Sequence, residues 1–253
     1  MTPELGIVGL GRMAQALLLP MLEAGVVSPG GVEAAVASTA SAERLSAAHG
    51  IRVSTTPHRA WQAPLVLLAV KPQQLDGAAT AAQAAVQAAE SRQPGLLISV
   101  LAGVTLQRLE ASFPGWRCVR AVPNTPALVR AGLTGLAFGA GVSEAQRTQM
   151  RALFGLVGEV HELPEAQLDA FLALTSSGPA FVALVAEAMA DGAVASGLPR
   201  PLAHQLAHRT LAGTAALLQE QQLHHLPHAG EQAEHRLPRL RRHPLAEGHG
   251  REA

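Results

Sequence analysis

The glycine-rich segment GLGRMA at residues 9–14 constrains the fold of this chain more than any other feature. It directly follows the apolar run LGIV and precedes a helix-forming stretch at 14–24. Glycines in this spacing between a strand and a helix are typical of a dinucleotide-binding turn, in which Gly9 permits the tight turn, Gly11 lets the backbone approach a pyrophosphate and Ala14 lets helix and strand pack closely. The helix N-terminus offers free amide groups to phosphates. We therefore predict dinucleotide contacts at Gly9, Gly11, Arg12, Met13 and Ala14.

Short apolar runs alternate with alanine-rich stretches of helical period over the first two thirds of the chain. This alternation predicts strands and helices in turn, and hence a doubly wound, mainly parallel α/β sheet. After residue 158 we expect no further strands, and 166–222 is nearly all helix-forming, with breaks at Gly178-Pro179 and at 197–199. We predict a dinucleotide-binding domain at 1–163, a helical dimerisation domain at 164–222 and an atypical tail at 223–253. Strands are expected at 4–9, 32–37, 65–70, 96–100 and 119–122.

The stretch 180–196 carries apolar residues around most of its helical circumference. A helix of this kind must be buried on several sides, which a small helical domain achieves against a partner chain. Charged residues make up only 15% of the chain, so little polar surface is available for solvent. These features predict a homodimer; the alternative is an internal helix of a monomer.

The charge balance and the single cysteine exclude several classes of protein. Nineteen basic residues against nineteen acidic ones give zero formal charge, which argues against a nucleic-acid surface. No uninterrupted apolar run approaches the length of about 18 residues needed for a membrane span, and the first residues lack the basic region of a signal peptide. We therefore expect a cytoplasmic protein. Cys118 alone permits neither an internal disulfide nor a multi-cysteine zinc site, and no metal site is expected.

The end of the second expected strand indicates which dinucleotide binds. Proteins for NAD usually place an Asp or Glu there, about 20 residues past the glycines, to accept from the ribose 2′-hydroxyl. This chain instead has Ser38 and Thr39, with Arg44 one turn into the following helix. Such a neutral-to-basic pocket suits the 2′-phosphate of NADP, so we predict that NADPH is preferred over NADH. The alternative is that Ser38 and Ser41 only cap that helix, a role that is compatible with also touching the phosphate.

The only lysine of the protein stands at the end of another apolar run, in Val70-Lys71-Pro72. Doubly wound folds bind ligands at the carboxyl ends of their strands. All eighteen other basic residues are arginine, which makes this lysine informative. We predict that Val70, Lys71 and Pro72 contact the cofactor; the alternative is a solvated surface lysine.

Two further turns follow strands at the same edge of the expected sheet. One contains Ala102 and Gly103, which we predict to contact the cofactor. The other, VPNTP, holds Asn124 and Thr125 in a stiff loop between two prolines. This loop would place an amide and a hydroxyl beside the nicotinamide, although an Asn-Thr pair in such a turn needs no function.

Together these segments resemble pyrroline-5-carboxylate reductase. The resemblance rests on GIVGLGRMAQAL, LLAVKPQ, ISVLAGVTLQRLE, VRAVPNTPALVRAGLTGL and LTSSGPAFVALVAEAMADG, in this order, and it extends from Leu5 to about Leu218. It implies a Rossmann-like cofactor domain and a helical domain that interlocks two chains into a dimer, often in a ring of dimers. It also implies reduction of the cyclic imine 1-pyrroline-5-carboxylate to L-proline with NADPH or NADH. The chain reads Ser176 where related sequences usually have glycine.

Imine reduction fits this inventory of residues. A hydride must pass from the nicotinamide to the imine carbon, and neither a metal nor a strong base is needed. The site must hold the substrate carboxylate and hydrogen-bond the ring nitrogen. We predict Asn124 as the catalytic-site residue that positions these groups, and Ser177 as a helix N-cap.

The tail departs from the family. Where related chains carry a segment similar to VTSPGGTT that completes the imino-acid site, this chain has six histidines and five arginines between residues 223 and 253. Their spacing fits neither a metal site nor, lacking aromatic residues, a nucleic-acid arm. A frameshifted or replaced C-terminus explains both the composition and the missing motif.

Two functions remain open from the sequence. The first is an NADPH-dependent reductase, impaired by its tail; the second is a non-catalytic dinucleotide-binding dimer that has lost its substrate segment. A β-hydroxyacid dehydrogenase shares the glycine-rich start but needs a lysine within its helical domain. Because Lys71 is the only lysine, that chemistry is excluded.

Overall fold

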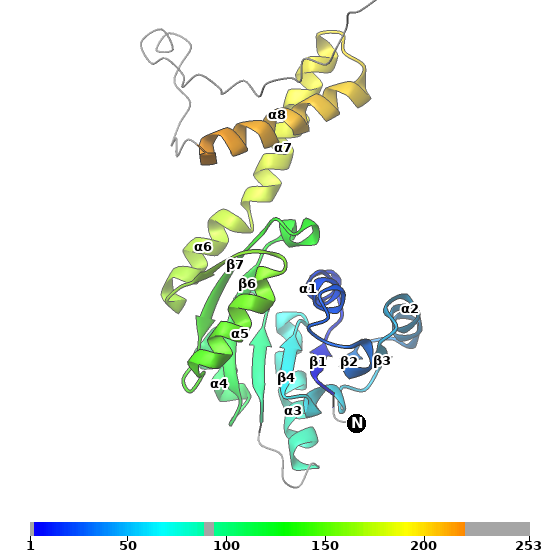
Figure 1. Cartoon of the computed structure of the whole chain (residues 1–253), viewed down its shortest axis with the longest axis vertical. Coiled ribbons are helices and arrows are strands. Elements are labelled where there is room, and N and C mark those ends of the chain that lie inside the picture. The colour runs from blue at the N-terminus through cyan, green and yellow to red at the C-terminus, as the bar shows by residue number, and fades with distance from the viewer. Residues whose placement is uncertain (1–2, 89–93, 221–253) are drawn as a thin grey trace, which may run out of the picture. The chain divides into compact units, whose positions relative to one another are not determined.

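The computed structural model describes residues 3–88 and 94–220 of the chain. They contain an eight-stranded sheet with the strand order β3-β2-β1-β4-β5-β6-β7-β8. Neighbouring strands are parallel except β6 and β7, which are antiparallel (Figure 1). The predicted doubly wound, mainly parallel α/β fold is therefore confirmed. The strands are β1 (Leu5–Val8), β2 (Val32–Ala35), β3 (Arg52–Ser54), β4 (Leu65–Leu68), β5 (Leu96–Ser99), β6 (Arg117–Pro123), β7 (Gly132–Phe138) and β8 (Gly158–Glu162).

The central strands are almost entirely apolar because both faces of the sheet are covered. Every residue of β1, β4 and β5 is buried, as a parallel sheet between two layers of helices requires. The strand order reverses at β1, which pairs with β2 on one side and β4 on the other. This reversal leaves a crevice at the carboxyl ends of these strands, the place where doubly wound folds bind ligands.

Two separate apolar clusters show which helices cover each face of the sheet. Side chains of α1, α2 and α5 pack on one face, and those of α3 and α4 pack on the other. The first cluster includes Leu17, Leu45 and Phe154, and the second includes Ala82 and Leu109. These helices are α1 (Arg12–Glu23), α2 (Thr39–His49), α3 (Leu75–Gln87), α4 (Leu106–Ser112) and α5 (Glu144–Gly155).

The expectation that no strand follows residue 158 is wrong, because β8 runs from Gly158 to Glu162. This strand forms one edge of the sheet and carries two glutamates and a histidine. The opposite edge strand, β3, has only three residues and also lacked a prediction. Short, polar edge strands protect a sheet against pairing with other chains, and the same property removes the apolar run by which a strand is predicted.

The C-terminal part of the described chain is helical, as predicted, and breaks near the expected positions. It consists of α6 (Leu168–Thr175), α7 (Gly178–Ala195) and α8 (Arg200–Glu220). The contacts within the chain separate a unit of residues 1–182, which includes α6, from a second unit that starts at 183. In the second unit a small cluster of Ala190, Ala203 and Ala207 joins α7 to α8. The predicted tail at 223–253 lies outside the described residues.

Both α7 and α8 expose large apolar side chains. Phe181 and Leu184 are each 65% exposed in this single chain, although a helix of such composition is normally buried. The exposed apolar residues of these helices and the turn between them are Phe181, Val182, Leu184, Val185, Met189, Leu198, Leu202, Leu206 and Leu217.

Candidate functional site

The turn after β1 has the conformation that its glycines predict. Gly9 has φ +95°, in the region that favours glycine, and a Cβ built there would lie 2.7 Å from the carbonyl oxygen of Ala69. Its amide donates to the carbonyl oxygen of Ala35 at 2.9 Å, which ties the turn to the end of β2. Gly11 is extended, and a Cβ there would meet no atom within 4 Å. The backbone at Gly11 is therefore open to a ligand.

A cleft of about 800 Å³ opens at the carboxyl ends of β1, β2 and β4. It lies where the strand order reverses, as expected for the ligand site of a doubly wound sheet. Its size is within the usual range for small-molecule and cofactor sites. The lining residues are 8–12, Gln15, 35–37, Ser41, Arg44, Leu45, Thr55, Pro57, 69–71, Gln73, Gln74, Gly77, Ala78 and Ala81.

Three cations line this cleft without counter-charges. Arg12, Arg44 and Lys71 are all exposed, and their side chains make no ion pair or hydrogen bond with any residue of the described chain. None of the lining residues is an aspartate or a glutamate. The N-terminus of α1 adds free amide groups and the positive end of the helix dipole. The cleft is therefore suited to a ligand with several negative charges, such as a dinucleotide phosphate.

Six of the predicted cofactor-contacting residues line the cleft together. They are Gly9, Gly11, Arg12, Arg44, Val70 and Lys71. Seven others are outside its lining: Met13, Ala14, Ser38, Thr39, Pro72, Ala102 and Gly103.

Several of these seven residues have a structural role that places them beside the cleft. Ala14 is 1% exposed and packs α1 on the sheet. Ser38 is the N-cap of α2, and its hydroxyl accepts from the amide of Ser41 at 3.3 Å. Pro72 begins the short 3₁₀ helix η3 (Pro72–Gln74) directly after Lys71. The helix cap that the sequence left open for Ser38 is thus present.

Other lining residues were not predicted. Thr55 and Pro57 follow β3, the edge strand that the sequence did not reveal, and so they had no strand end to mark them. Gln15 lies on α1, and its amide nitrogen donates to the carbonyl oxygens of Leu10 at 3.2 Å and Gly11 at 3.3 Å. Helical position alone gives no signal for such a contact with the turn.

Asn124 is buried and connects two segments that are distant in the sequence. Its side-chain nitrogen donates to the carbonyl oxygen of Thr175 at 3.0 Å, and its side-chain oxygen accepts from the amide of Leu133 at 2.8 Å. Thr175 ends α6, and α7 starts three residues later, directly after Ser177. Asn124 therefore holds the loop after β6 against the turn between α6 and α7.

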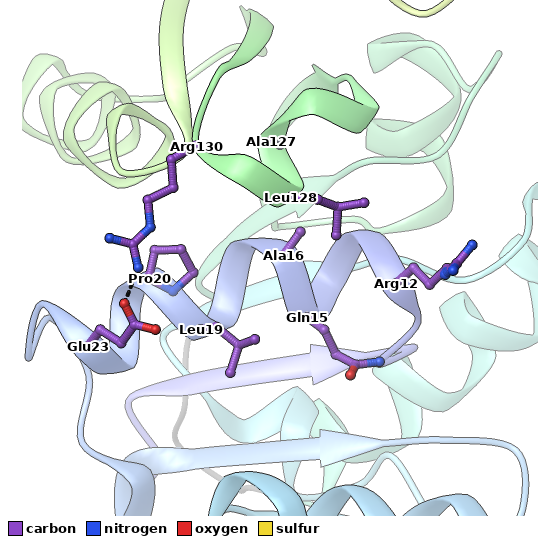
Figure 2. A pocket seen from close by; sticks show the side chains of 9 residues that line it. All are labelled: Arg12, Gln15, Ala16, Leu19, Pro20, Glu23, Ala127, Leu128 and Arg130. Atoms are coloured by element: carbon purple, nitrogen blue, oxygen red, sulfur yellow. Dashed lines mark hydrogen bonds and ion pairs between the residues drawn. The ribbon is translucent and has the colours of Figure 1, made fainter. Parts of the chain in front are cut away.

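The loop after Asn124 also packs on α1, as Figure 2 shows. Residues 125–129 form the 3₁₀ helix η4 (Thr125–Val129), and Leu128 lies over Ala16 at the edge of a second pocket of about 280 Å³. Arg130, with φ +58°, closes one end of this pocket by an ion pair with Glu23. Arg12 lies at the other end and lines both pockets. The Asn124 loop is thus held next to the helix that begins the cofactor cleft.

In the described part of the chain, no group of three or more His, Cys, Asp or Glu side chains is placed to hold a metal ion. Cys118 is fully buried in β6. Burial, followed by the negative charge of Glu110, raises the pKa of the Cys118 thiol to about 12. This thiol therefore stays protonated at neutral pH and is not a nucleophile.

Two family models match the chain, one in the part that forms the sheet and one in the part that includes the C-terminal helices. Residues 4–103 match a model described as NADP oxidoreductase, coenzyme F420-dependent. Residues 165–233 match a model described as pyrroline-5-carboxylate reductase dimerisation. The second match includes the helical stretch Glu165–Ala195, which is long and apolar enough to pass a simple length-and-composition test for a membrane span. An apolar surface covered by a second chain satisfies the same test.

Individual relatives match over most of the chain. A pyrroline-5-carboxylate reductase from Synechocystis is 41% identical over 225 residues, which cover 88% of this chain and 82% of the relative. The solved structure of a pyrroline-5-carboxylate reductase from Coxiella burnetii is similar at a TM-score of 0.77 and 28% identity, covering 92% of this chain and 89% of that one. The enzyme of Plasmodium falciparum, solved with NADP bound, shares the fold at a TM-score of 0.75 and 24% identity, covering 89% and 85% of the two chains.

Proposed function

This chain belongs to the pyrroline-5-carboxylate reductase family, and we propose that it reduces 1-pyrroline-5-carboxylate to L-proline with NADPH, the last step of proline synthesis. The observation that carries the proposal is the 41% identity to a named reductase along both the cofactor-binding and the helical parts of the chain. The cleft with three unpaired cations supports it, because the reaction needs a site for a dinucleotide phosphate.

The residues of the cleft fit NADP. Gly11 leaves its backbone open, so the first turn of α1 can bind the pyrophosphate through its amides, with Arg12 beside it. Ser41 and Arg44 lie next to the end of β2, the place where NAD-specific proteins have a carboxylate. An arginine and a hydroxyl there favour the 2′-phosphate. Lys71, at the end of β4, adds a third positive charge.

Bound NADPH would supply the hydride, and the protein has to orient the imine and stabilise its charge. A hydride reaches the imine carbon most readily when the ring nitrogen is protonated, which requires a hydrogen-bonded site but no metal. We propose Asn124 as the residue that positions this site. Both of its hydrogen bonds are made to backbone groups, so it sets the relation between the loop after β6 and the turn at Ser177.

The exposed apolar helices support a dimer as the working state. We propose that 1–163 binds the cofactor and that 164–222 associates with a second copy. The exposed apolar side chains of α7 and α8 require a cover, and the family model that matches this region is one for dimerisation. We further propose that the dimers assemble into a ring. The protein would act in the cytoplasm on a small-molecule substrate and would bind neither nucleic acid nor membrane.

A steady-state assay tests the reaction. The purified full-length chain is incubated with NADPH and 1-pyrroline-5-carboxylate, and both NADPH consumption and proline formation are measured. We expect equal amounts of the two. NADPH binding without proline formation would overturn the proposed reaction and favour a non-catalytic dinucleotide-binding dimer.

Calorimetric titration tests the cofactor preference. NADPH should bind at least several-fold more tightly than NADH, and Arg44→Ser should remove most of this difference. Arg117→Ser is the matched control, since Arg117 is also exposed but lies at the amino end of β6, away from the carboxyl edge of the sheet. Equal affinities of the unmodified protein for the two cofactors would contradict the proposal.

A further inference from the structure

Arg120 is a buried charged residue in β6 that the cofactor cleft does not use. It is 2% exposed. Its two terminal nitrogens donate to Oε1 of Glu165 at 3.1 Å and to Oδ1 of Asp169 at 3.0 Å. Its Nε is buried and has no hydrogen-bond partner among the described residues. Its guanidinium is therefore only partly satisfied by two carboxylates, one of which, on Asp169, is 84% exposed.

This arrangement is a poor way to stabilise a core. Removing a guanidinium from water is costly, and replacing a buried ion pair by apolar side chains of similar volume is often neutral or stabilising. The unpaired Nε adds a further desolvation cost. The partners of Arg120 indicate that it positions other segments, namely the loop between β5 and α4, the loop after β6 and the turn between α6 and α7.

Glu165 connects Arg120 to the loop after β5. The same Oε1 that pairs with Arg120 accepts from the amide of Leu106 at 2.6 Å. Leu106 is the first residue of α4, so this amide has no partner inside its own helix. Arg120 thus holds Glu165 where it ties down the N-terminus of α4 and the end of the loop from β5.

Arg120 and Asn124 hold the two ends of α6. Asp169, the second partner of Arg120, lies in the first turn of α6. Asn124, four residues after Arg120, binds the carbonyl of Thr175 at the last residue of this helix. β6 and the residue that follows it therefore fix both ends of an eight-residue helix that leads directly to the turn before α7.

We propose that Arg120 is a positioning residue for imine reduction. Through Glu165, Asp169 and the neighbouring Asn124 it aligns three loops: the one between β5 and α4, the one after β6, and the turn between α6 and α7. The first two loops follow β5 and β6, which lie beyond β4 on the side away from β2, and the turn is bound to the second loop through Asn124. We assign the meeting of substrate and nicotinamide to this side of the sheet. The inference rests on the proposed function, because it assigns these loops to the substrate side.

The expected effect follows from the demands of hydride transfer. Reacting atoms must be held about 3–3.5 Å apart, and a displacement of about 1 Å can lower the rate about 100-fold. Loss of Arg120 would leave the cofactor cleft intact, because none of the residues in the network lines it. Cofactor affinity and catalysis should therefore respond differently to the same substitution.

The experiment compares four variants in the full-length protein, one of them Arg120→Lys. Arg120→Met removes the charge at similar volume, and Glu165→Gln keeps an acceptor for Leu106 while weakening the pair. Arg108→Met is the control, since Arg108 forms an exposed ion pair with Asp76 at 2.6 Å. Dissociation constants for NADPH, kcat and KM for 1-pyrroline-5-carboxylate, and amide hydrogen exchange of residues 124–131 and 168–175 are measured for each.

We expect kcat/KM to fall about 100-fold in Arg120→Met and about tenfold in Glu165→Gln, with the NADPH dissociation constant within twofold of the unmodified protein. Exchange should rise in both segments, and Arg108→Met should change nothing. Arg120→Lys, which keeps the charge, should recover part of the loss. If Arg120→Met does not fold, the Glu165→Gln result decides.

A lower melting temperature with kcat/KM within threefold of the unmodified value would overturn the inference, since Arg120 would then be merely structural. Equal losses of NADPH affinity and turnover would also overturn it. If the unmodified protein forms no proline, the proposed function fails instead. Hydrogen exchange then decides the inference alone: unchanged exchange at 124–131 in Glu165→Gln refutes the alignment of these loops.

Discussion

Replacing Gly9 by alanine should destabilise the protein, whereas the same change at Gly11 should leave it folded and impair cofactor binding. Gly9 has φ +95°, and an added Cβ would lie 2.7 Å from the carbonyl oxygen of Ala69 and 2.9 Å from the amide nitrogen of Val70. Both contacts are backbone atoms directly after β4, so no flexible side chain can move aside.

The magnitude for Gly9→Ala has two parts. Placing an L-residue in a left-handed conformation costs about 1–2 kcal/mol, and forcing an extra carbon into a close-packed site costs about 1–3 kcal/mol. We therefore expect a loss of about 2–5 kcal/mol in the free energy of unfolding. For a protein of this size, each kcal/mol lowers the melting temperature by about 2–4 °C.

Replacing Gly50 by alanine measures the conformational cost without the steric cost. Gly50 has φ +65° at the C-cap of α2, and a Cβ there would meet no atom within 4 Å. Gly50→Ala should therefore cost only the conformational part, about 1–2 kcal/mol. Gly11→Ala should cost less still, because Gly11 is extended and unobstructed. Its methyl group would project where the pyrophosphate approaches, so NADPH affinity should fall at least tenfold.

Thermal denaturation of the three variants and titration with NADPH decide the prediction. The expected order of melting temperatures is Gly9→Ala lowest, then Gly50→Ala, with Gly11→Ala close to the unmodified protein. Normal stability of Gly9→Ala would refute the argument from the Ala69 contact. Normal NADPH affinity of Gly11→Ala would show that the pyrophosphate does not approach this turn.

Three more predictions address the cleft, the core and the tail. Lys71→Met should weaken NADPH binding about tenfold, by loss of a charge-assisted hydrogen bond. Its melting temperature should be nearly unchanged, because this side chain is exposed. Calorimetry measures the binding and a thermal melt the stability; a large stability loss with unchanged binding would show that the lysine is structural. Since burial raises the pKa of Cys118 to about 12 from the ordinary 9.0, the unfolded state loses this proton first, so the free energy of unfolding should fall as pH rises from 9 towards 12. Denaturant titrations over this pH range should show a shallower fall in Cys118→Ala, and identical pH dependence would contradict it. A chimera with a VTSPGGTT segment after Gln222 should reduce pyrroline-5-carboxylate at least about 100-fold faster than the unmodified chain, the cost of a missing transition-state donor; comparable steady-state turnover would show that the substrate site was misplaced.

The predictability of each strand from the sequence follows its place in the sheet. β1, β4 and β5 are buried on both faces, so their sequences are apolar runs, interrupted only by Ser99 at the end of β5. The edge strands β3 and β8 are short or charged, and β7 contains two glycines, so none of them has such a run. Their positions depend on pairing with neighbouring strands, which local sequence does not encode.

The residues of the candidate site also divide into those that local sequence reveals and those that depend on distant contacts. That Gly9, Gly11 and Lys71 lie together in the cleft was predictable, because each of them stands at a strand end or a turn that is recognisable in the adjacent sequence. The bond from Asn124 to Thr175 joins residues 51 positions apart. The pairing of Arg120 with Glu165 likewise depends on how α6 packs against the sheet. Such contacts require the three-dimensional arrangement of elements that are distant in the sequence.

The exposed apolar surface of α7 and α8 makes stability a property of the protein's concentration as well as of its sequence. Side chains such as Phe181 and Leu184 contribute little to folding while 65% exposed, and their apolar area stabilises the fold only when the proposed second copy covers it. Each tenfold dilution would then lower the apparent stability by about 1.4 kcal/mol. A newly synthesised chain meets competing associations before it meets its partner, because uncovered apolar helices also bind to other unfolded chains. The yield of active protein should therefore depend on how fast two copies find each other.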